Sequence, residues 1–357
     1  MSERSLTKRI ATAAFIVALT LGVSSHPDVS SPAHAAEAPK PECPPELTFQ
    51  TKGNERWLSI TRDLLAKGNL TLDQAVNRTL TCNPTAASID QPTIIKIEKG
   101  QYTYGKAIRL GSYTTLAGSG INNTLLFYEP NSDDDEAVGV QNNGIFTHIQ
   151  IRDLSLTGPG NRSKEIDGIK LADTTHANIQ SVDVSKFSRD GILLSSGKAN
   201  KGVDKSSISN CSISHNGRNG ISITNGNRNT IEDCSVSYNS EPTRAGDYGV
   251  AGIDLEPDSS NSVTNTMVKR NRVFRNGWNG IAAATENIEE GKNTGNIVCD
   301  NEIFENGHNG INETTENDRR RPNSYYRNNP QPLRSHVMPK SIISDEIHPE
   351  CALKTAS

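Results

Sequence analysis

The chain has 357 residues, a formal net charge of −4 and only 5% aromatic residues. This slightly acidic composition lacks the concentrated positive charge by which proteins bind nucleic acid, so we expect no nucleic-acid partner. Six cysteines in a chain of this length are also too few for a small disulfide-rich scaffold.

The first 35 residues have the features of a secretory signal peptide. Basic residues precede the apolar stretch Ile10–Val23, and Ala33-His34-Ala35 fits a small-x-small cleavage site. The apolar stretch is too short to span a bilayer comfortably, and a retained anchor is the alternative. We therefore expect a secreted protein, periplasmic or extracellular, with no membrane contact beyond the leader.

Both ends of the mature chain differ in composition from its middle. Residues 36–54 are polar and rich in proline, and predict a linker. Residues 55–92 predict an N-terminal cap with two short helices, Glu55–Ala66 and Leu72–Leu80, which would cover the exposed edge of the first strands. Residues 318–357 are polar and predict an irregular C-terminal tail.

From Thr93 onward apolar and polar residues alternate, and a Gly-Ile dipeptide returns at steps of 23 to 32 residues. A recurrence of this length indicates stacked units, each too small to bury its own apolar face. The dipeptide occurs at residues 144–145, 168–169, 191–192, 220–221, 252–253, 280–281 and 310–311.

A second strand precedes the dipeptide in each unit, and its third position forms a column across the units. This column contains Val182, Cys211, Cys234, Asn271 and Asn301. Because stacked strands lie about 4.8 Å apart, Asn271 over Asn301 predicts an amide ladder. Cys211 over Cys234 predicts a reduced, buried pair, with a disulfide as the alternative.

The other four cysteines lie toward the two ends of the repeat region. Cys43 and Cys82 flank the N-terminal segment, whereas Cys299 and Cys351 connect the last unit with the tail. We expect each of these two pairs to form a disulfide in an oxidising compartment.

The pattern resembles the right-handed parallel β-helix superfamily, which includes pectate lyases, polygalacturonases, alginate epimerases and phage tailspikes. The resemblance implies an all-β, single-stranded parallel β-helix over residues 93–317 with short N-terminal capping helices. The N-T-D, D-D, G-H-G and R-I-K motifs of polygalacturonases are absent, and Asp254-Leu255-Glu256-Pro257 stands where epimerases carry D-P-H. No family's catalytic residues can therefore be assigned to this chain.

Asp254 and Glu256 are the only carboxylates in the two columns that point outward after each Gly-Ile. They lie two residues apart on one strand, so both face the same way. Their neighbours on adjacent units are the small residues Ser222, Thr224, Ala282 and Ala284, which predict a groove with a low floor. Paired carboxylates suit the general acid of glycoside cleavage and its base or nucleophile. The alternatives are an exposed, solvated strand and a Ca²⁺ site that also uses Asp258.

A further column, before each dipeptide, contains candidate substrate-binding residues. Arginine can hold a carboxylate or sulfate with two hydrogen bonds, and tryptophan can offer an apolar platform to a sugar. Tyr248 lies in the longest unit, beside the acid pair, and could carry a proton. The alternative is that these residues merely cover a corner of the fold. The expected substrate-binding residues are Arg189, Arg218, Tyr248, Trp278 and His308.

Two other polar features have mainly structural interpretations. A column directly before the glycine is expected to adopt the left-handed turn of each corner, with a minor functional option for its two carboxylates. The acidic run Asp133–Glu136 predicts a solvated loop, with a weak cation site as the alternative. The column contains Asp167, Asp190, Asn219, Asn279 and Asn309.

We therefore expect a secreted protein that binds and cleaves a polysaccharide. The arginines favour an anionic polysaccharide. The first hypothesis is a glycoside hydrolase that uses Asp254 and Glu256 and requires no cofactor. The second is a polysaccharide lyase or uronate epimerase, which neutralises the uronate with Ca²⁺ or arginine and uses Tyr248 or Lys170 as a base. The third is a non-catalytic glycan-binding or surface protein. A monomer and a trimer both fit the sequence.

Overall fold

The structure is a computed structural model that describes residues 44–82, 87–140, 144–160, 164–240, 250–258, 261–283, 292–313, 324–326, 328–330, 342–344, 349 and 351. The expected signal peptide and most of the expected linker lie outside these residues. So do Cys43, Tyr248 and Ala284.

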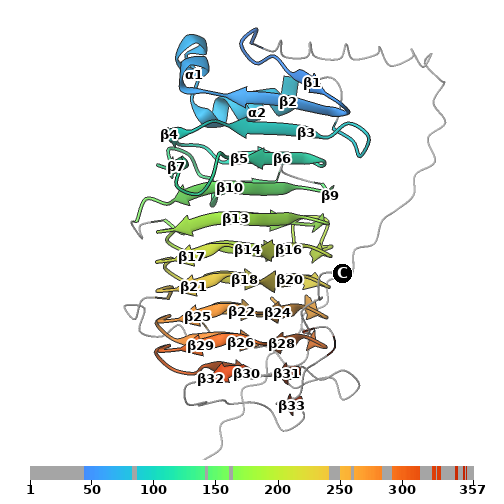
Figure 1. Cartoon of the computed structure of the whole chain (residues 1–357), viewed down its shortest axis with the longest axis vertical. Coiled ribbons are helices and arrows are strands. Elements are labelled where there is room, and N and C mark those ends of the chain that lie inside the picture. Colours follow the sequence, from blue (N-terminus) through green and yellow to red (C-terminus); the bar gives the residue numbers. More distant parts are fainter. Residues whose placement is uncertain are drawn as a thin grey trace, which may run out of the picture. The chain divides into compact units, whose positions relative to one another are not determined.

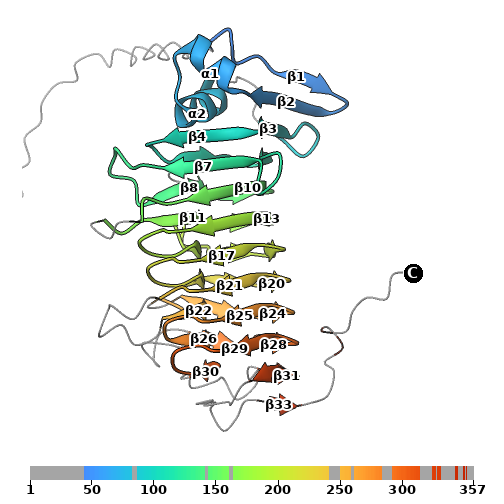
Figure 2. The same cartoon turned by 60° about the vertical axis from the view of Figure 1, so that its left-hand side comes forward.

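Parallel strands form three sheets that run along one stack of coils (Figures 1 and 2). The eight-stranded sheet consists of β5 (Ile108–Leu110), β8 (Glu136–Val140), β11 (Asp167–Ala172), β14 (Ile192–Ser195), β18 (Ile221–Ile223), β22 (Ala251–Leu255), β26 (Asn279–Ala283) and β30 (Ile311–Glu313). The six-stranded sheet consists of β9 (Phe146–Thr147), β12 (Thr174–Thr175), β15 (Val203–Asp204), β19 (Gly226–Asn227), β23 (Ser262–Thr264) and β27 (Lys292–Thr294).

The largest sheet has 19 strands, and several coils contribute two of them. Its strands are β1 (Gln50–Lys52), β2 (Glu55–Ile60), β3 (Thr93–Ile97), β4 (Gly100–Tyr104), β6 (Thr114–Ala117), β7 (Thr124–Tyr128), β10 (Gln150–Thr157), β13 (Asn178–Ser185), β16 (Ser207–Ser209), β17 (Ser212–Ser214), β20 (Thr230–Glu232), β21 (Ser235–Ser237), β24 (Met267–Lys269), β25 (Arg272–Phe274), β28 (Ile297–Cys299), β29 (Glu302–Phe304), β31 (Ser324–Tyr326), β32 (Asn329–Pro330) and β33 (Ile342–Ser344). The predicted right-handed parallel β-helix is thereby confirmed.

The isoleucine of the repeated dipeptide forms the core side of the eight-stranded sheet. Ile221 pairs in register with Ile253, and Ile253 with Ile281, and all three are fully buried. The dipeptide at residues 144–145 does not belong to this series, because Ile145 is 57% exposed. In that coil Val138 occupies the core position and pairs with Ile169.

The left-handed corners lie elsewhere than the sequence predicts. None of the five Asx residues before the glycines has a positive φ, whereas Asp233, Arg270 and Asp300 do. These three residues directly precede the column that contains Cys234, Asn271 and Asn301. The prediction for the column at Asp167 and its equivalents is therefore wrong, and its side chains have another role, described below.

Buried asparagines form ladders along the stack. The predicted contact is confirmed, because the Asn271 amide nitrogen donates to Asn301 Oδ1 at 3.0 Å. A second ladder, which the sequence did not reveal, joins Asn216, Asn239, Asn276 and Asn306 through amide hydrogen bonds of 2.9 to 3.1 Å. Each amide also satisfies backbone groups of the neighbouring coils, as burial requires.

The N-terminal end is closed by a strand and two helices. Residues 55–60 form β2 rather than the predicted helix, because Leu58 and Ile60 alternate inward and β2 pairs in parallel with β3. The helices are α1 (Arg62–Gly68) and α2 (Leu72–Cys82), the second close to the predicted Leu72–Leu80. No helix in the described ranges is long and apolar enough to cross a bilayer.

The C-terminal tail is not wholly irregular. Strand β31 pairs in parallel with β28, and β33 pairs with β31, so the stack continues beyond residue 317. The predicted disulfide between Cys299 and Cys351 is present, with the two Cα atoms 6.3 Å apart. Cys211 and Cys234 are free and buried, as predicted, and do not form the alternative disulfide.

The second asparagine ladder gives a test of the fold. Asn276→Ala removes an amide that serves Asn239, Asn306 and the carbonyl of Val236. Because the remaining buried groups lose their partners, we expect the free energy of unfolding to fall by about 3 kcal/mol in urea denaturation. The exposed Asn122→Ala is the control, and equal stability of the two variants would contradict the ladder's role.

Candidate functional site

The outer face of the eight-stranded sheet carries a continuous column of side chains. Pairing confirms the predicted register, because Ser222 lies beside Asp254 and Asp254 beside Ala282. Asp254 alternates with Ile253 and Leu255, which both belong to the hydrophobic core, so its side chain points away from that core. From the N-terminal end, the column reads Arg109, Gly139, Lys170, Leu193, Ser222, Asp254, Ala282 and Asn312.

Asp254 and Glu256 lie close enough together for the charge of Glu256 to act on the Asp254 carboxyl. Asp254 is only 1% exposed, whereas Glu256 is partly exposed. Burial raises the pKa of Asp254 well above its usual range, and the charge of Glu256 raises that pKa further. The protonated carboxyl of Asp254 is therefore the favoured form, with Glu256 as its neighbour.

The floor around the pair is small, as predicted, but it is not open at Asp254. Ser222, Thr224 and Ala282 are all buried. The amide of Asn219 donates to Asp254 Oδ2 at 3.0 Å and fixes that carboxyl from the preceding coil. Only Glu256 of the two acids is thus in a position to meet a ligand without rearrangement.

Arg218 lies one coil before the acid pair, but its guanidinium already holds a carboxylate of the protein. Nε lies 2.8 Å from Asp190 Oδ1, and Nη2 lies 2.6 Å from Oδ2. This two-point geometry is the one expected for a bound substrate carboxylate. The predicted direct contact of Arg218 with substrate is therefore replaced, in this structure, by an internal ion pair with a buried partner.

The Asx column explains why that carboxylate is buried. Each side-chain oxygen accepts the backbone N–H of the next coil: Asp190 N donates to Asp167 Oδ1 at 3.1 Å, and Asn219 N donates to Asp190 Oδ1 at 3.1 Å. Asn219 Oδ1 continues the series by accepting from Ala251 N at 2.7 Å. The column therefore ties successive coils together instead of forming their corners.

Asp167 is the least compensated member of this column. It is fully buried, and its nearest cation, Arg189, lies 3.7 Å away. Burial and then the charge of Asp190 raise the pKa of Asp167 to about 7, against the opposing effect of Arg189. Arg189, like Arg218, thus faces a protein carboxylate.

Trp278 and His308 stack on each other in consecutive coils. Their ring centroids are 4.3 Å apart and the planes differ by 4°. One face of the indole is therefore covered by the imidazole, so that only its remaining surface can serve as the predicted sugar platform.

A family model described as the right-handed β-helix region matches residues 136–329, more than half of the chain. The chain belongs to the right-handed β-helix family. No match to a curated protein is found for this β-helix.

Solved structures share the fold of this β-helix at low sequence identity. The catalytic domain of Agl-KA is 15% identical, with a TM-score of 0.53, over 76% of this chain and 44% of that chain. Iota-carrageenase complexed to iota-carrageenan fragments is 12% identical, with a TM-score of 0.50, over 68% and 52%. The Dettilon tailspike protein is 12% identical, with a TM-score of 0.50, over 72% and 47%. This chain thus spans about half of each of those proteins.

The calcium alternative stays a prediction. Within the described ranges, no group of three or more His, Cys, Asp or Glu side chains is placed to hold a metal. Asp258 is exposed, and Asp254 is a poor Ca²⁺ ligand while it is protonated.

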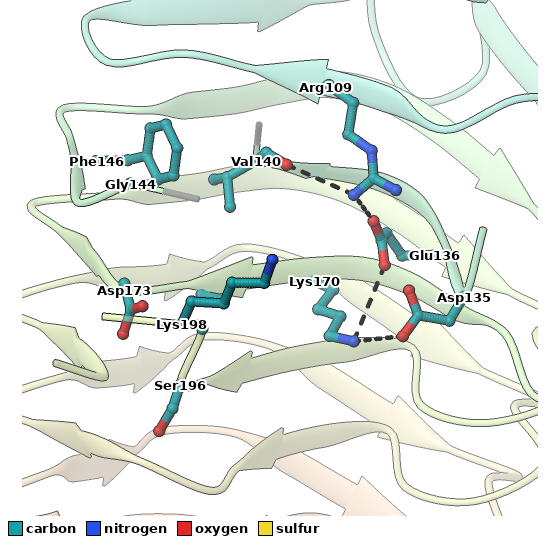
Figure 3. Close-up of a pocket in the computed structure, with 12 residues that line it drawn as sticks. Arg109, Asp135, Glu136, Val140, Gly144, Phe146, Lys170, Asp173, Ser196 and Lys198 are labelled. Atoms are coloured by element: carbon teal, nitrogen blue, oxygen red, sulfur yellow. Dashed lines mark hydrogen bonds and ion pairs between the residues drawn. The ribbon is translucent and has the colours of Figure 1, made fainter. Parts of the chain in front are cut away.

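A cavity of about 430 Å³ lies at the other end of the same face, near β8 and β11 (Figure 3). Sequence reasoning missed it because the acidic run beside it was interpreted as a solvated loop. Asp134 lies 2.8 Å from Arg109, Asp135 lies 2.6 Å from Lys170, and buried Glu136 contacts both cations. The sequence feature that could have indicated the cavity is the acidic run, which lies one strand away from the outward-facing residues Arg109 and Lys170.

The raised pKa of Asp167 predicts how stability depends on pH. Its folded pKa of about 7 exceeds its ordinary value of 3.8, so between these values the folded state binds the extra proton. The stability due to Asp167 is therefore present at low pH and falls as pH rises toward 7, by up to about 1.4 kcal/mol per pH unit.

Asp167→Asn tests this expectation, because Asn219 shows that an amide fits the same column. We expect the stability difference, wild type minus variant, to decline from pH 5 to pH 7 and then level off. Chemical denaturation across this range measures it. A difference that rises with pH, or does not change, would show that Asp167 is ionised in the folded protein.

Proposed function

We propose that this protein binds a polysaccharide along the outer face of the eight-stranded sheet and hydrolyses it at Glu256. The proposal rests mainly on one observation: a partly exposed Glu256 lies two residues from a buried Asp254 on the outer face of the sheet, and the charge of Glu256 helps to raise the pKa of Asp254. Two carboxyls whose environments hold them in different protonation states can take and give protons in one reaction.

The burial of the two acids suggests distinct roles. Glu256 is the catalytic residue, because it is the acid that a substrate can reach. Asp254 is a positioning residue: its protonated carboxyl donates a hydrogen bond to Glu256 and keeps the Glu256 carboxylate available as a base. Water then gives a proton to Glu256 as it attacks the sugar, and the acid pair returns a proton to the leaving oxygen.

The spacing of the pair refines this mechanism. Residues two apart on one strand have Cα atoms about 7 Å apart, and their side-chain rotamers set the separation of the two carboxyls. A separation of about 5 Å fits a retaining glycosidase, and a larger one fits an inverting enzyme. The stereochemical outcome follows from which of these occurs.

A polysaccharide is the substrate class that best suits a linear face. The outer column repeats about every 4.8 Å along the stack, so that equivalent positions can meet successive units of an extended polymer. A similar structure supports this choice, since it is an iota-carrageenase complexed to iota-carrageenan fragments.

The lyase or epimerase alternative requires a cation beside the reacting uronate. Arg218 is already paired with Asp190, and Lys170 lies three strands away from Asp254. Hydrolysis needs no such cation, so it is the proposal that the described residues support better. A non-catalytic glycan-binding role keeps the same face without turnover.

We also propose that the protein works outside the cytoplasm, as its N-terminal sequence predicts. The disulfide between Cys299 and Cys351 supports this proposal, because such bonds persist in oxidising compartments.

Substitution of Glu256 tests the catalytic role. After a panel of polysaccharides has been screened for new reducing ends and for unsaturated products, Glu256→Gln should lower kcat by about 10³-fold on the substrate found. Asp254→Asn should retain more activity, because its amide still donates to Glu256, and should alter the pH profile. The exposed Asp258→Asn is the control.

Two outcomes would contradict this assignment. Full turnover by Glu256→Gln would remove Glu256 from the chemistry. Unsaturated products from the wild-type protein would show that the reaction is that of a lyase and not hydrolysis.

A further inference from the structure

A glycine of the outer column lies between two residues that line the cavity near β8 and β11. Gly139 separates Arg109 from Lys170 in that column. A Cβ at residue 139 would lie 3.1 Å from Glu136 Cγ and 3.1 Å from the Lys170 carbonyl oxygen. The missing side chain thus leaves room for Glu136 beside the two cations.

The cavity is rich in hydrogen-bond donors. Figure 3 shows Arg109 and Lys170 held on one side by Glu136 and Asp135. A guanidinium has five N–H groups and an ammonium has three, and the ion pairs with Asp134, Asp135 and Glu136 engage only some of them. The remaining donors suit oxygen atoms of a ligand.

Lys198 supplies a third cation from a separate loop. Its side chain is exposed, and its ammonium is directed toward the middle of the cavity (Figure 3). Within the described part of the chain it makes no ion pair, in contrast to Arg109 and Lys170.

The loop that carries Lys198 is fixed from below. The buried carboxylate of Asp173 accepts backbone N–H groups of Ala199, Lys201 and Gly202 at 2.7 to 3.1 Å. Asp173 therefore uses its charge on the loop itself and does not neutralise Lys198. The loop that carries Lys198 is thus already ordered by Asp173, so little further loop entropy is lost when Lys198 binds a ligand.

The opposite wall is apolar. Phe146 and Val140 line it, and Ala172 adds a small surface beside them. A site with an apolar wall, a few fixed polar groups and a volume of about 430 Å³ has the features of a small-molecule site, and one or two sugar rings match that volume.

We infer that this cavity is a distal subsite for an acidic sugar of the same polysaccharide, with its carboxylate or sulfate group bound by Lys198. The inference rests on the proposed function and deepens it by naming the substrate class. Lys170 and Asp254 lie three strand spacings apart in one column, which is about 14 Å along the stack. The acidic sugar thus lies a few units from the bond that Glu256 meets.

Binding by the inactive full chain tests the subsite without turnover. The Glu256→Gln protein is titrated with polygalacturonate, alginate and iota-carrageenan, and with neutral dextran for comparison. Lys198→Ala in the same background should weaken the best acidic polymer about fivefold, the effect of one ion pair, while Lys198→Arg restores most of the affinity. Lys201→Ala, an exposed lysine on the same loop, is the matched control.

The outcomes separate the inference from the function beneath it. If an acidic polymer binds but Lys198→Ala and Lys201→Ala behave alike, the subsite is wrong and the proposed function stands. The subsite is also wrong if dextran binding falls as much as acidic-polymer binding. If neither wild type nor Glu256→Gln binds any acidic polymer, both the subsite and polysaccharide binding on this face lose their basis.

Discussion

The whole structure depends on the register between successive coils. Because parallel strands pair residue by residue at about 4.8 Å, a residue in one coil faces the equivalent residue of the next, and like is stacked on like. Isoleucines meet isoleucines in the core, and asparagines meet asparagines in the ladders. The same constraint places Asp254 between Ser222 and Ala282, and Gly139 between Arg109 and Lys170.

Burial of polar groups distinguishes the outer face of the eight-stranded sheet from an ordinary solvated surface. Asp167, Asp190 and Asp254 are all at most 1% exposed. Asp190 is compensated by Arg218, while Asp167 and Asp254 respond with raised pKa values. A structural column that ties coils together and an acid pair suited to proton transfer thus share one face and one electrostatic environment.

The sequence predicted well what alternation and spacing decide. The outward direction of Asp254 and the Asn271–Asn301 contact follow from strand periodicity alone. The burial of Asp254 could not be predicted in this way, because it depends on groups outside its strand. Arg218 was assigned to substrate because the sequence cannot show that Asp190, 28 residues earlier, already occupies it. The cavity was missed because its coil has Val138 in place of the repeated isoleucine, so Gly139 was never aligned with Lys170.

The disulfide at the C-terminal end has a consequence for how the protein comes apart. A stack in which each coil touches only its neighbours loses order from its ends inward. Helix α2 seals one end by apolar contact, whereas the bond between Cys299 and Cys351 fastens the other covalently. Reduction of that bond should therefore free the C-terminal end of the stack, so that the last coils lose order more readily than they do with the bond intact.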